Sequence, residues 1–238
     1  PPADPTLKQG HISIAWPVDI LFGLHNQFAG FLMPYITGTR HVMDVYHPKT
    51  RRQVCPMFNW RYLHYTAANL SSAVAALHAR GYCIGDINER NILVKDTAMV
   101  TLIDTDSFQV FSSAGMFRCL VGVPEFTPPE LIGKSFAQVD RSVESDNFSL
   151  AVLIFKLLME GVHPFDGLYQ GAGDPPPLED RISRGDYPHS GNPCQIKPRP
   201  HALVLDVLHA EIRQMFHQCF AEGHRLPSQR PTAARWKE

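Results

Sequence analysis

The sequence predicts an α+β fold in which a short β-rich part precedes a larger helical part. Two apolar segments near the N-terminus, residues 12–22 and 28–35, favour strands, and the residues between them are typical of a turn. Beyond residue 60, apolar residues recur at three- and four-residue spacing, which indicates helices. The 238 residues, 44% hydrophobic and 19% charged, suffice for a sizeable core.

The helical part is expected to begin after a loop over residues 47–56, which is rich in Pro and basic residues. A helix over 60–80 follows, and Gly81 ends it as a C-cap would. Its buried stripe consists of Leu63, Ala67, Leu70, Val74 and Leu77. Three further helices are expected over 146–160, 178–184 and 202–220. The first of these three is apolar nearly all round, which implies burial on every side.

One segment carries most of the chemical information. Asp86 and Asn91 stand five residues apart, and Asp104 and Asp106 follow directly after an apolar, strand-like run that ends at residue 103. Phosphoryl transfer from a nucleotide uses such a set, because one Asp orients or deprotonates the acceptor hydroxyl while an Asn and another Asp hold Mg²⁺. Amide and carboxylate oxygens are hard ligands that suit this ion.

Further motifs follow in a fixed order and carry a family resemblance. Met33-Pro34-Tyr35-Ile36 is similar to the hinge between two lobes, and Glu130 lies in GVPEFTPPELI, which resembles the P+1 loop and A-P-E segment. Asp146 leads a buried central helix, and Arg230 lies in QRPTA, whose Arg pairs with that Glu. From about residue 30 to the end, the chain resembles protein kinases of the eukaryotic type.

The resemblance implies a bilobal fold that binds ATP and Mg²⁺. Residues 1–36 would be a partial β-rich small lobe with two strands and the hinge, and residues 37–238 the helical large lobe. Asp86 would be the catalytic residue. The metal ligands would be Asn91, Asp104 and Asp106, with Asp104 preferred over Asp106 because it directly follows the strand. The adenine-binding residues would be Met33, Tyr35, Ile36 and Leu93.

Departures from the family pattern restrict these expectations. Ile84-Gly85 replaces the usual His-Arg, so no cation is present to receive a phosphate on the activation loop. Asn88 replaces the Lys of Ser/Thr kinases, and Val123 replaces its Thr partner, which puts Ser/Thr preference in doubt. Thr105 stands where Phe is usual, so the hydrophobic connection between the lobes must be built differently.

Several small-lobe elements are not found in the sequence. A glycine-rich phosphate loop, its companion Lys and the helix with the partner Glu would precede residue 12, where only eleven residues stand. We expect that both ends of the domain are clipped, with a degenerate kinase as the alternative. Without the loop and the Lys, residues 1–238 alone are expected to be inactive.

The expected function is Mg²⁺-dependent transfer of the ATP γ-phosphate to a protein hydroxyl. An alternative is a small-molecule phosphotransferase of the aminoglycoside or choline kinase type, which would lack the A-P-E segment. The second alternative is a pseudokinase scaffold, against which the intact Asp86, Asn91 and Asp104 argue.

The motifs GDINERNILV and LIDTDSFQV most closely resemble bacterial kinase-like proteins of tellurium-resistance-type gene clusters, some with helix-hairpin-helix extensions. That resemblance implies a protein substrate, a von Willebrand A-type protein and a PP2C-type phosphatase as partners. The net charge of −1 gives no reason to expect nucleic acid or an anionic membrane. The apolar run over 150–158 is too short to span a bilayer. Five Cys without C-x-x-C spacing favour reduced thiols in a cytoplasm.

Overall fold

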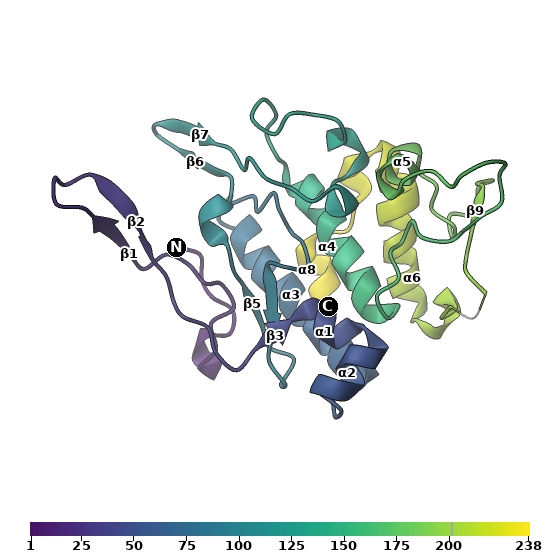
Figure 1. Cartoon of the computed structure of the whole chain (residues 1–238), viewed down its shortest axis with the longest axis horizontal. Helices are drawn as coiled ribbons and strands as arrows, with labels where there is room; N and C mark the ends of the chain where they lie inside the picture. Colours follow the sequence, from purple (N-terminus) through teal and green to yellow (C-terminus); the bar gives the residue numbers. More distant parts are fainter. Residues whose placement is uncertain (201) are drawn as a thin grey trace.

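Two long helices, α3 (Trp60–His78) and α4 (Val143–Leu158), lie at the centre of the molecule, and short antiparallel sheets and smaller helices surround them (Figure 1). This computed structural model describes residues 1–200 and 202–238. The predicted α+β fold class is confirmed. Within the described residues, no helix combines the length and the apolarity needed to cross a membrane.

Helix α3 follows the predicted periodicity closely. The Asn59 side chain caps its first turn by accepting a hydrogen bond from the Tyr62 amide. The predicted stripe is buried throughout, with Leu63, Leu70, Val74 and Leu77 wholly inaccessible to solvent. The helix ends two residues earlier than predicted, at His78, because the chain then turns through Gly81, whose φ of 75° is left-handed.

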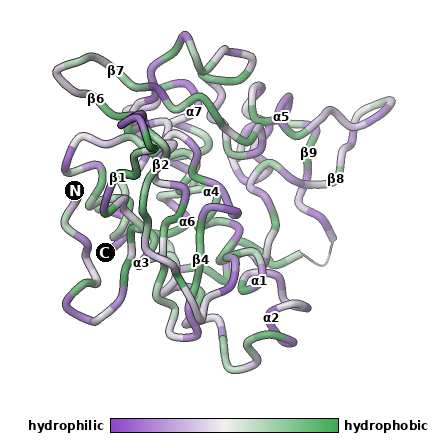
Figure 2. The backbone as a smooth tube through the Cα atoms, turned by 60° about the vertical axis from the view of Figure 1, so that its left-hand side comes forward, coloured by the Kyte–Doolittle hydropathy of each residue, from purple (hydrophilic) through white to green (hydrophobic). Residues whose placement is uncertain are grey.

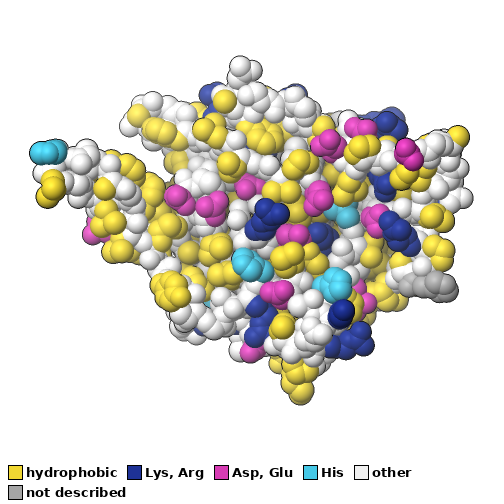
Figure 3. All heavy atoms as spheres, in the orientation of Figure 1, with side chains coloured by type: hydrophobic (Ala, Val, Ile, Leu, Met, Phe, Trp, Pro, Cys, Tyr) yellow, Lys and Arg dark blue, Asp and Glu magenta, His cyan; other side chains and the backbone are white. Residues whose placement is uncertain are grey.

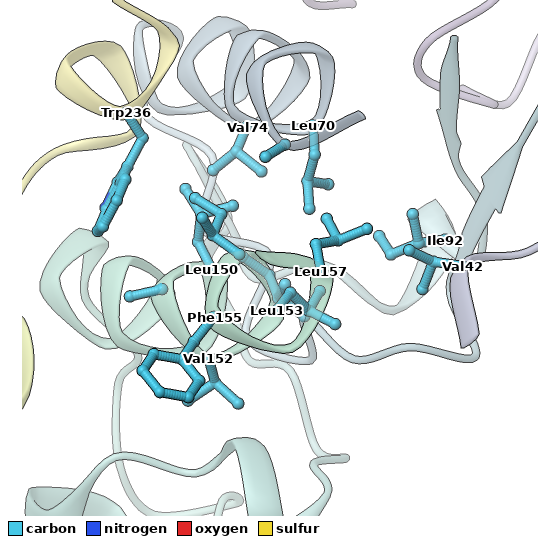
Figure 4. Packing of buried hydrophobic residues seen from close by; sticks show 14 of the residues in the cluster. Val42, Leu70, Val74, Ile92, Leu150, Val152, Leu153, Phe155, Leu157 and Trp236 are labelled. Atoms are coloured by element: carbon cyan, nitrogen blue, oxygen red, sulfur yellow. The ribbon is translucent and has the colours of Figure 1, made fainter. Parts of the chain in front are cut away.

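Helix α4 begins three residues before the predicted start, because Ser142 and Ser145 form a reciprocal capping box. Nearly every residue of α4 is buried, as its apolar circumference predicts. Figure 4 shows Leu150 and Leu157 directed towards α3, whereas Val152 and Phe155 point to the opposite side. The hydrophobic core therefore surrounds α4 and packs against both of its faces.

The predicted loop over 47–56 is wrong in its main part. Two short helices, α1 (Val42–Tyr46) and α2 (Pro48–Val54), occupy this region. Pro48 suits the first helical turn because the missing N–H would have no partner there. Arg51 then donates hydrogen bonds to the Tyr46 carbonyl and to Glu160, at 3.1 and 2.8 Å. The second contact spans 109 residues of sequence, and local composition does not reveal it.

The C-terminal helices agree only in part with the prediction. Helix α5 (Leu178–Arg184) has the predicted bounds. The single helix expected over 202–220 is wrong, because the region divides into a 3₁₀ turn, α6 (Ala210–His217) and a π-helical turn. The His209 side chain caps α6 by accepting from the Glu211 amide, so the helix begins there. The chain continues through α7 (Gly223–Arg225) to α8 (Ala233–Lys237).

The N-terminal strands are shorter than predicted. β1 (Asp19–Phe22) and β2 (Phe28–Leu32) form an antiparallel hairpin that projects from the body (Figure 1). Figure 2 shows their hydrophobic stretches lying together, and hydrophobic side chains cover the projecting arm in Figure 3. Exposed side chains in this arm include Ile20, Leu21, Phe22, Phe28 and Phe31. β2 stops before Pro34, which lacks the N–H that a ladder needs.

Residues 12–18, predicted as part of the first strand, lie outside it. Ser13 and Ala15 bond to β5 instead, with Leu102 donating to the Ser13 carbonyl at 2.8 Å and accepting from the Ala15 amide at 2.9 Å. Part of the expected small lobe is thus fastened to the large one. The division at residue 36 stays a prediction.

The sheet that carries the candidate site consists of β3 (Arg40–His41), β4 (Ile92–Val94) and β5 (Val100–Leu102), all antiparallel. A hairpin pairs β6 (Val110–Ser112) with β7 (Gly115–Phe117), and a separate two-stranded sheet pairs β8 (Leu168–Tyr169) with β9 (Ile196–Lys197). Short 3₁₀ turns complete the fold at Leu7–Gln9, Thr105–Ser107, Pro124–Phe126, Pro129–Leu131, Leu205–Val207 and Pro227–Gln229.

Candidate active site

The loop that carries Asp86 is held by the first turn of α4. Asp146, only 1% exposed, accepts hydrogen bonds from the Ile84 and Gly85 amides at 2.7 and 2.8 Å. The Nε2 atom of His78 lies 3.0 Å from the same carboxylate. Asp146 therefore ties α4 to this loop and fixes the backbone immediately before Asp86.

Asp86 and Asn91 meet within this loop. The Asn91 Nδ2 atom donates to the Asp86 carbonyl at 3.1 Å and lies 3.4 Å from the Asp86 Oδ2 atom. The Asp86 Oδ1 atom is buried and has no hydrogen-bond partner among the described residues. Leaving a buried carboxylate oxygen without a donor is costly. This atom could accept a hydrogen bond from a hydroxyl group or from a metal-bound water.

Asp104 is brought beside Asn91 by the β4–β5 ladder. The Ile103 amide donates to the Asn91 carbonyl at 3.0 Å, which extends the ladder to the residue before Asp104. Asp104 has φ 61° and ψ 36°, a left-handed conformation that Asp tolerates better than most residues. Ser107 fixes the Asp104 carbonyl through its amide and its hydroxyl, at 3.3 and 2.9 Å. The Asp104 side chain is exposed.

Asp106 is less closely connected to the site. It lies in the 3₁₀ turn Thr105–Ser107 and is exposed. Among the contacts of the described residues, none joins its side chain to Asp86, Asn91 or Asp104. Its role as a metal ligand stays a prediction.

The donor set suits Mg²⁺ better than a metal that needs a full protein cage. In the described part of the chain, no three His, Cys, Asp or Glu side chains gather into a metal-binding group. Mg²⁺ typically takes one or two carboxylates together with substrate phosphates and waters. Because the Asn91 Nδ2 atom faces Asp86, the Asn91 Oδ1 atom remains available for a cation beside Asp104. The residues present therefore fit this ion.

The predicted adenine-binding residues do not share one described cavity. Tyr35, 91% exposed, and Ile36 line a hollow of about 150 Å³ together with His11 and Lys95. Met33 follows β2 and is half-buried, outside that lining. Leu93 lies in the middle of β4, where it pairs with β3 and β5. The assignment of these four residues to adenine stays a prediction.

Asn88 serves the loop itself. It is 3% exposed, its Nδ2 atom lies 3.3 Å from the Asp86 carbonyl, and its Oδ1 atom accepts from the Arg90 amide at 2.9 Å. A side chain bound in this way is not free to reach a phosphate group. Asn88 therefore differs from the usual Lys in two ways: it carries no charge, and its side chain is engaged in stabilising the loop.

A buried polar cluster of Tyr46, Glu89 and Lys156, which the sequence analysis did not predict, anchors the same loop. Glu89 accepts hydrogen bonds from the Tyr46 hydroxyl and from Lys156, which is 8% exposed within apolar α4. Burial, followed by the bond to Glu89, raises the pKa of Tyr46 well above its usual range. The single Lys in the otherwise apolar run 150–158 was the available signal, because a buried ammonium requires a carboxylate partner.

Thr105 replaces an aromatic contact with a polar one. Its hydroxyl donates to the Ala15 carbonyl at 2.7 Å, and both residues are buried. Next to it, the Trp16 ring packs 4.8 Å from the Tyr82 ring and 6.4 Å from the Phe108 ring. These contacts occupy the place where an aromatic connection was expected, and how the lobes are joined stays a prediction.

The predicted pair between Glu130 and Arg230 is confirmed. Two parallel hydrogen bonds of 2.7 Å join the guanidinium to the carboxylate. The Arg230 side chain is fully buried, whereas 31% of the Glu130 side chain is exposed. Arg230 also donates to the Glu144 and Gly223 carbonyls, each at 2.9 Å, so the pair ties the C-terminal turns to α4.

Comparisons with known proteins agree with this geometry. Residues 25–237 match the family model described as protein kinase domain. Protein kinase YegI of Escherichia coli O157:H7 is 37% identical over 229 residues, which cover 94% of this chain and 35% of the relative, and the protein of strain K12 gives the same values. A probable cAMP-dependent protein kinase catalytic subunit of Encephalitozoon cuniculi (strain GB-M1) is 28% identical over 141 residues, 59% of this chain and 39% of the relative. The chain thus spans about a third of the length of the Escherichia coli relatives.

Proposed function

Because the chain belongs to the protein kinase domain family, we propose that it transfers the γ-phosphate of ATP to a hydroxyl group of a protein. The observation that carries this proposal is the contact between Asp86 and Asn91, with Asp104 next to them on the β4–β5 ladder. The Asp86 Oδ1 atom, buried without a donor among the described residues, could accept a hydrogen bond from an acceptor hydroxyl.

Asp86 is the residue that receives or orients the acceptor proton. Its Oδ1 atom would accept the hydrogen bond from the incoming hydroxyl, and the contact with Asn91 holds the other oxygen. A positioned general base contributes about 10²–10⁴-fold to the rate of such a step.

Asn91 and Asp104 would hold Mg²⁺, with Asp106 as a further candidate ligand. When bound, the ion neutralises charge on the phosphates and keeps the transferred group in line. On the protein side, the two Ser107 bonds hold the backbone of Asp104, from which the exposed carboxylate would reach the ion. Met33, Tyr35, Ile36 and Leu93 are proposed to bind the adenine.

The acceptor is proposed to be a Ser or Thr hydroxyl, as in the kinases with an A-P-E segment. The segment around Glu130 and its pair with Arg230 support a protein acceptor over aminoglycosides or choline. We further propose that the protein acts in the cytoplasm and is closest to the kinase-like proteins of tellurium-resistance-type gene clusters. A von Willebrand A-type protein and a PP2C-type phosphatase are its proposed partners.

The decisive experiment compares Asp86→Asn with the wild type in the full-length protein, because residues 1–238 alone are proposed to be inactive. We expect incorporation of phosphate from ATP to fall by at least about 10²-fold, with an unchanged melting temperature. Asp174→Asn, an exposed residue of the loop after α4, is the matched control and should retain full activity. Transfer at the wild-type rate by the Asp86 variant would refute the proposed role.

A binding measurement separates an enzyme from a scaffold. ATP should raise the melting temperature only when Mg²⁺ is present, and Asp104→Ala should abolish that increase. A wild-type protein whose melting temperature does not respond to ATP and Mg²⁺ would favour the scaffold. Parallel assays with aminoglycosides, choline and generic protein substrates would identify the acceptor class.

A further inference from the structure

Arg141 is a buried cation outside the site described so far. It precedes the cap of α4 and is only 5% exposed. Burial lowers the pKa of its guanidinium from the ordinary value. A buried charge is costly unless hydrogen bonds and nearby groups compensate it. The contacts that Arg141 makes therefore indicate why the sequence keeps a cation here.

These contacts join segments that are distant in the sequence. An Arg141 Nη atom donates to the Val121 carbonyl at 2.8 Å, and the guanidinium stacks 3.7 Å from the centre of the Phe136 ring. The backbone of Arg141 pairs with the Gln109 side chain, at 2.7 and 2.9 Å. Gln109 in turn pairs by its backbone with Cys83, at 2.8 and 3.3 Å, three residues before Asp86.

Gly85 brings Arg141 close to the catalytic loop. Gly85 has φ 76°, and a Cβ atom there would lie 2.7 Å from the Cys119 Cβ atom and 3.3 Å from the Arg141 Cγ atom. Only glycine fits both the left-handed backbone and this lack of space. Cys119 and Arg141 thus pack directly on the residue that precedes Asp86, which places the segment around Cys119 next to the loop that carries Asp86.

Arg141 also contacts two residues that line a hollow, Gly122 and Phe136. A Cβ atom on Gly122 would lie 2.7 Å from the Phe136 ring and 3.0 Å from an Arg141 Nη atom. Gly122 and Phe136 line a hollow of about 110 Å³ together with Pro124, Thr127, Leu131, Ile132, Gly133, Lys134 and Glu179. The stack of Arg141 on Phe136 therefore fixes one wall of this hollow.

We propose that Arg141 is a positioning residue that holds residues 119–123 against the Gly85–Asp86 turn, so that the acceptor side of the site is ordered in the unmodified chain. The expected effect on phosphate transfer rests on the proposed function, whereas the packing of Arg141 against residues 119–123 can be tested without it. Val121 and Phe136 are the groups that the Arg141 side chain contacts, whereas Gln109 holds the Arg141 backbone.

The kinetic test uses Arg141→Lys in the full-length protein. Lys keeps the charge but cannot stack as a plane on Phe136 and bond Val121 at once. We expect kcat/KM for the protein acceptor to fall by about 10- to 100-fold, because small misplacements of a reacting group are costly. ATP hydrolysis, which uses water as the acceptor, should change less than about 2-fold. Arg118→Lys is the control, because Arg118 is part-exposed and pairs with the neighbouring Asp140.

Equal losses of acceptor transfer and ATP hydrolysis in Arg141→Lys would overturn the proposal, since they would indicate general damage. Unchanged acceptor kinetics would overturn it as well. A loss confined to the acceptor would support it.

A second readout is independent of catalysis. Cys119 and Cys219 are both fully buried, and burial raises the pKa of each thiol, so both should resist alkylation in the wild type. In Arg141→Lys, alkylation of Cys119 should accelerate at least about 10-fold, while Cys219 stays protected. Acceleration of neither thiol, or of both equally, would overturn the inference. A wild-type protein without phosphate transfer would refute the proposed function, and the alkylation result would still decide the role of Arg141.

Discussion

Single residues around the site are chosen by backbone conformation and by specific hydrogen bonds. Gly85 is required by its left-handed φ and by the close approach of Cys119. Asp104 adopts a left-handed backbone that Ser107 stabilises. Thr105, directly after it, donates to the Ala15 carbonyl and so connects the turn after β5 to the N-terminal segment. Each of these positions tolerates few other residues for a distinct physical reason.

Thr105→Val removes this hydrogen bond while keeping the shape of the side chain. The buried Ala15 carbonyl would lose its donor, so we expect the free energy of unfolding to fall by about 1–3 kcal/mol. Thr105→Ser keeps the hydroxyl and should cost less than half as much. Urea unfolding of both variants measures the difference, and equal stabilities would contradict the proposed importance of the bond.

Elements far apart in sequence are joined by a small number of charged contacts. Arg230 connects the last turns of the chain to Glu130 and to the start of α4. Lys156 likewise connects α4 to the loop that carries Asp86, through its bond to Glu89. In each case a buried cation is matched by a carboxylate from another element, as burial of charge requires.

Glu130→Ala should destabilise the protein strongly, because it leaves the Arg230 charge buried without its partner. We expect a loss of about 2–4 kcal/mol, somewhat below the usual cost of breaking a fully buried pair because Glu130 is partly exposed. Asp206→Ala breaks the exposed pair with Arg213 and should cost less than about 1 kcal/mol. Thermal unfolding compares the two variants. Similar losses of stability would show that burial does not increase the contribution of the Arg230 pair.

The stability of the whole molecule should depend on pH through His163. Its Nε2 atom donates to the Glu125 carbonyl at 2.8 Å, and its Nδ1 atom accepts from the Phe165 amide at 3.2 Å. The neutral ring therefore satisfies both contacts, whereas a second proton would have to displace the Phe165 bond. Burial lowers the pKa of His163 from 6.5 to about 4.

Between pH 6.5 and about 4, the unfolded chain binds a proton at His163 that the folded chain does not bind. The free energy of unfolding should therefore decrease as the pH falls through this range, by up to about 3 kcal/mol, and this contribution becomes constant below the folded pKa. In His163→Gln this contribution is absent. Urea titrations at pH 7, 5.5 and 4 test the prediction, and parallel pH profiles for both proteins would contradict it.

Patterns local in the sequence predicted much of the fold. The stripe of α3, the apolar circumference of α4 and the bounds of α5 follow from periodicity, because each depends on neighbouring residues. The proximity of Asp86 and Asn91 was also local, since five residues of one loop separate them. The predictions failed where a distant partner decided the outcome. α2 is held by a contact to Glu160, and residues 13–15 pair with Leu102 rather than extending a strand.

The order of motifs, the character of the main helices and the identity of the acid and amide groups were fixed by the amino-acid sequence itself. Only the tertiary structure decided that Asp104 lies beside Asn91, that Lys156 serves Glu89, and that Arg141 covers Gly85. These arrangements depend on contacts between residues that are not neighbours along the chain. Periodicity and composition indicate whether a residue is buried or exposed. Which distant residue it contacts is determined only by how the helices and sheets pack.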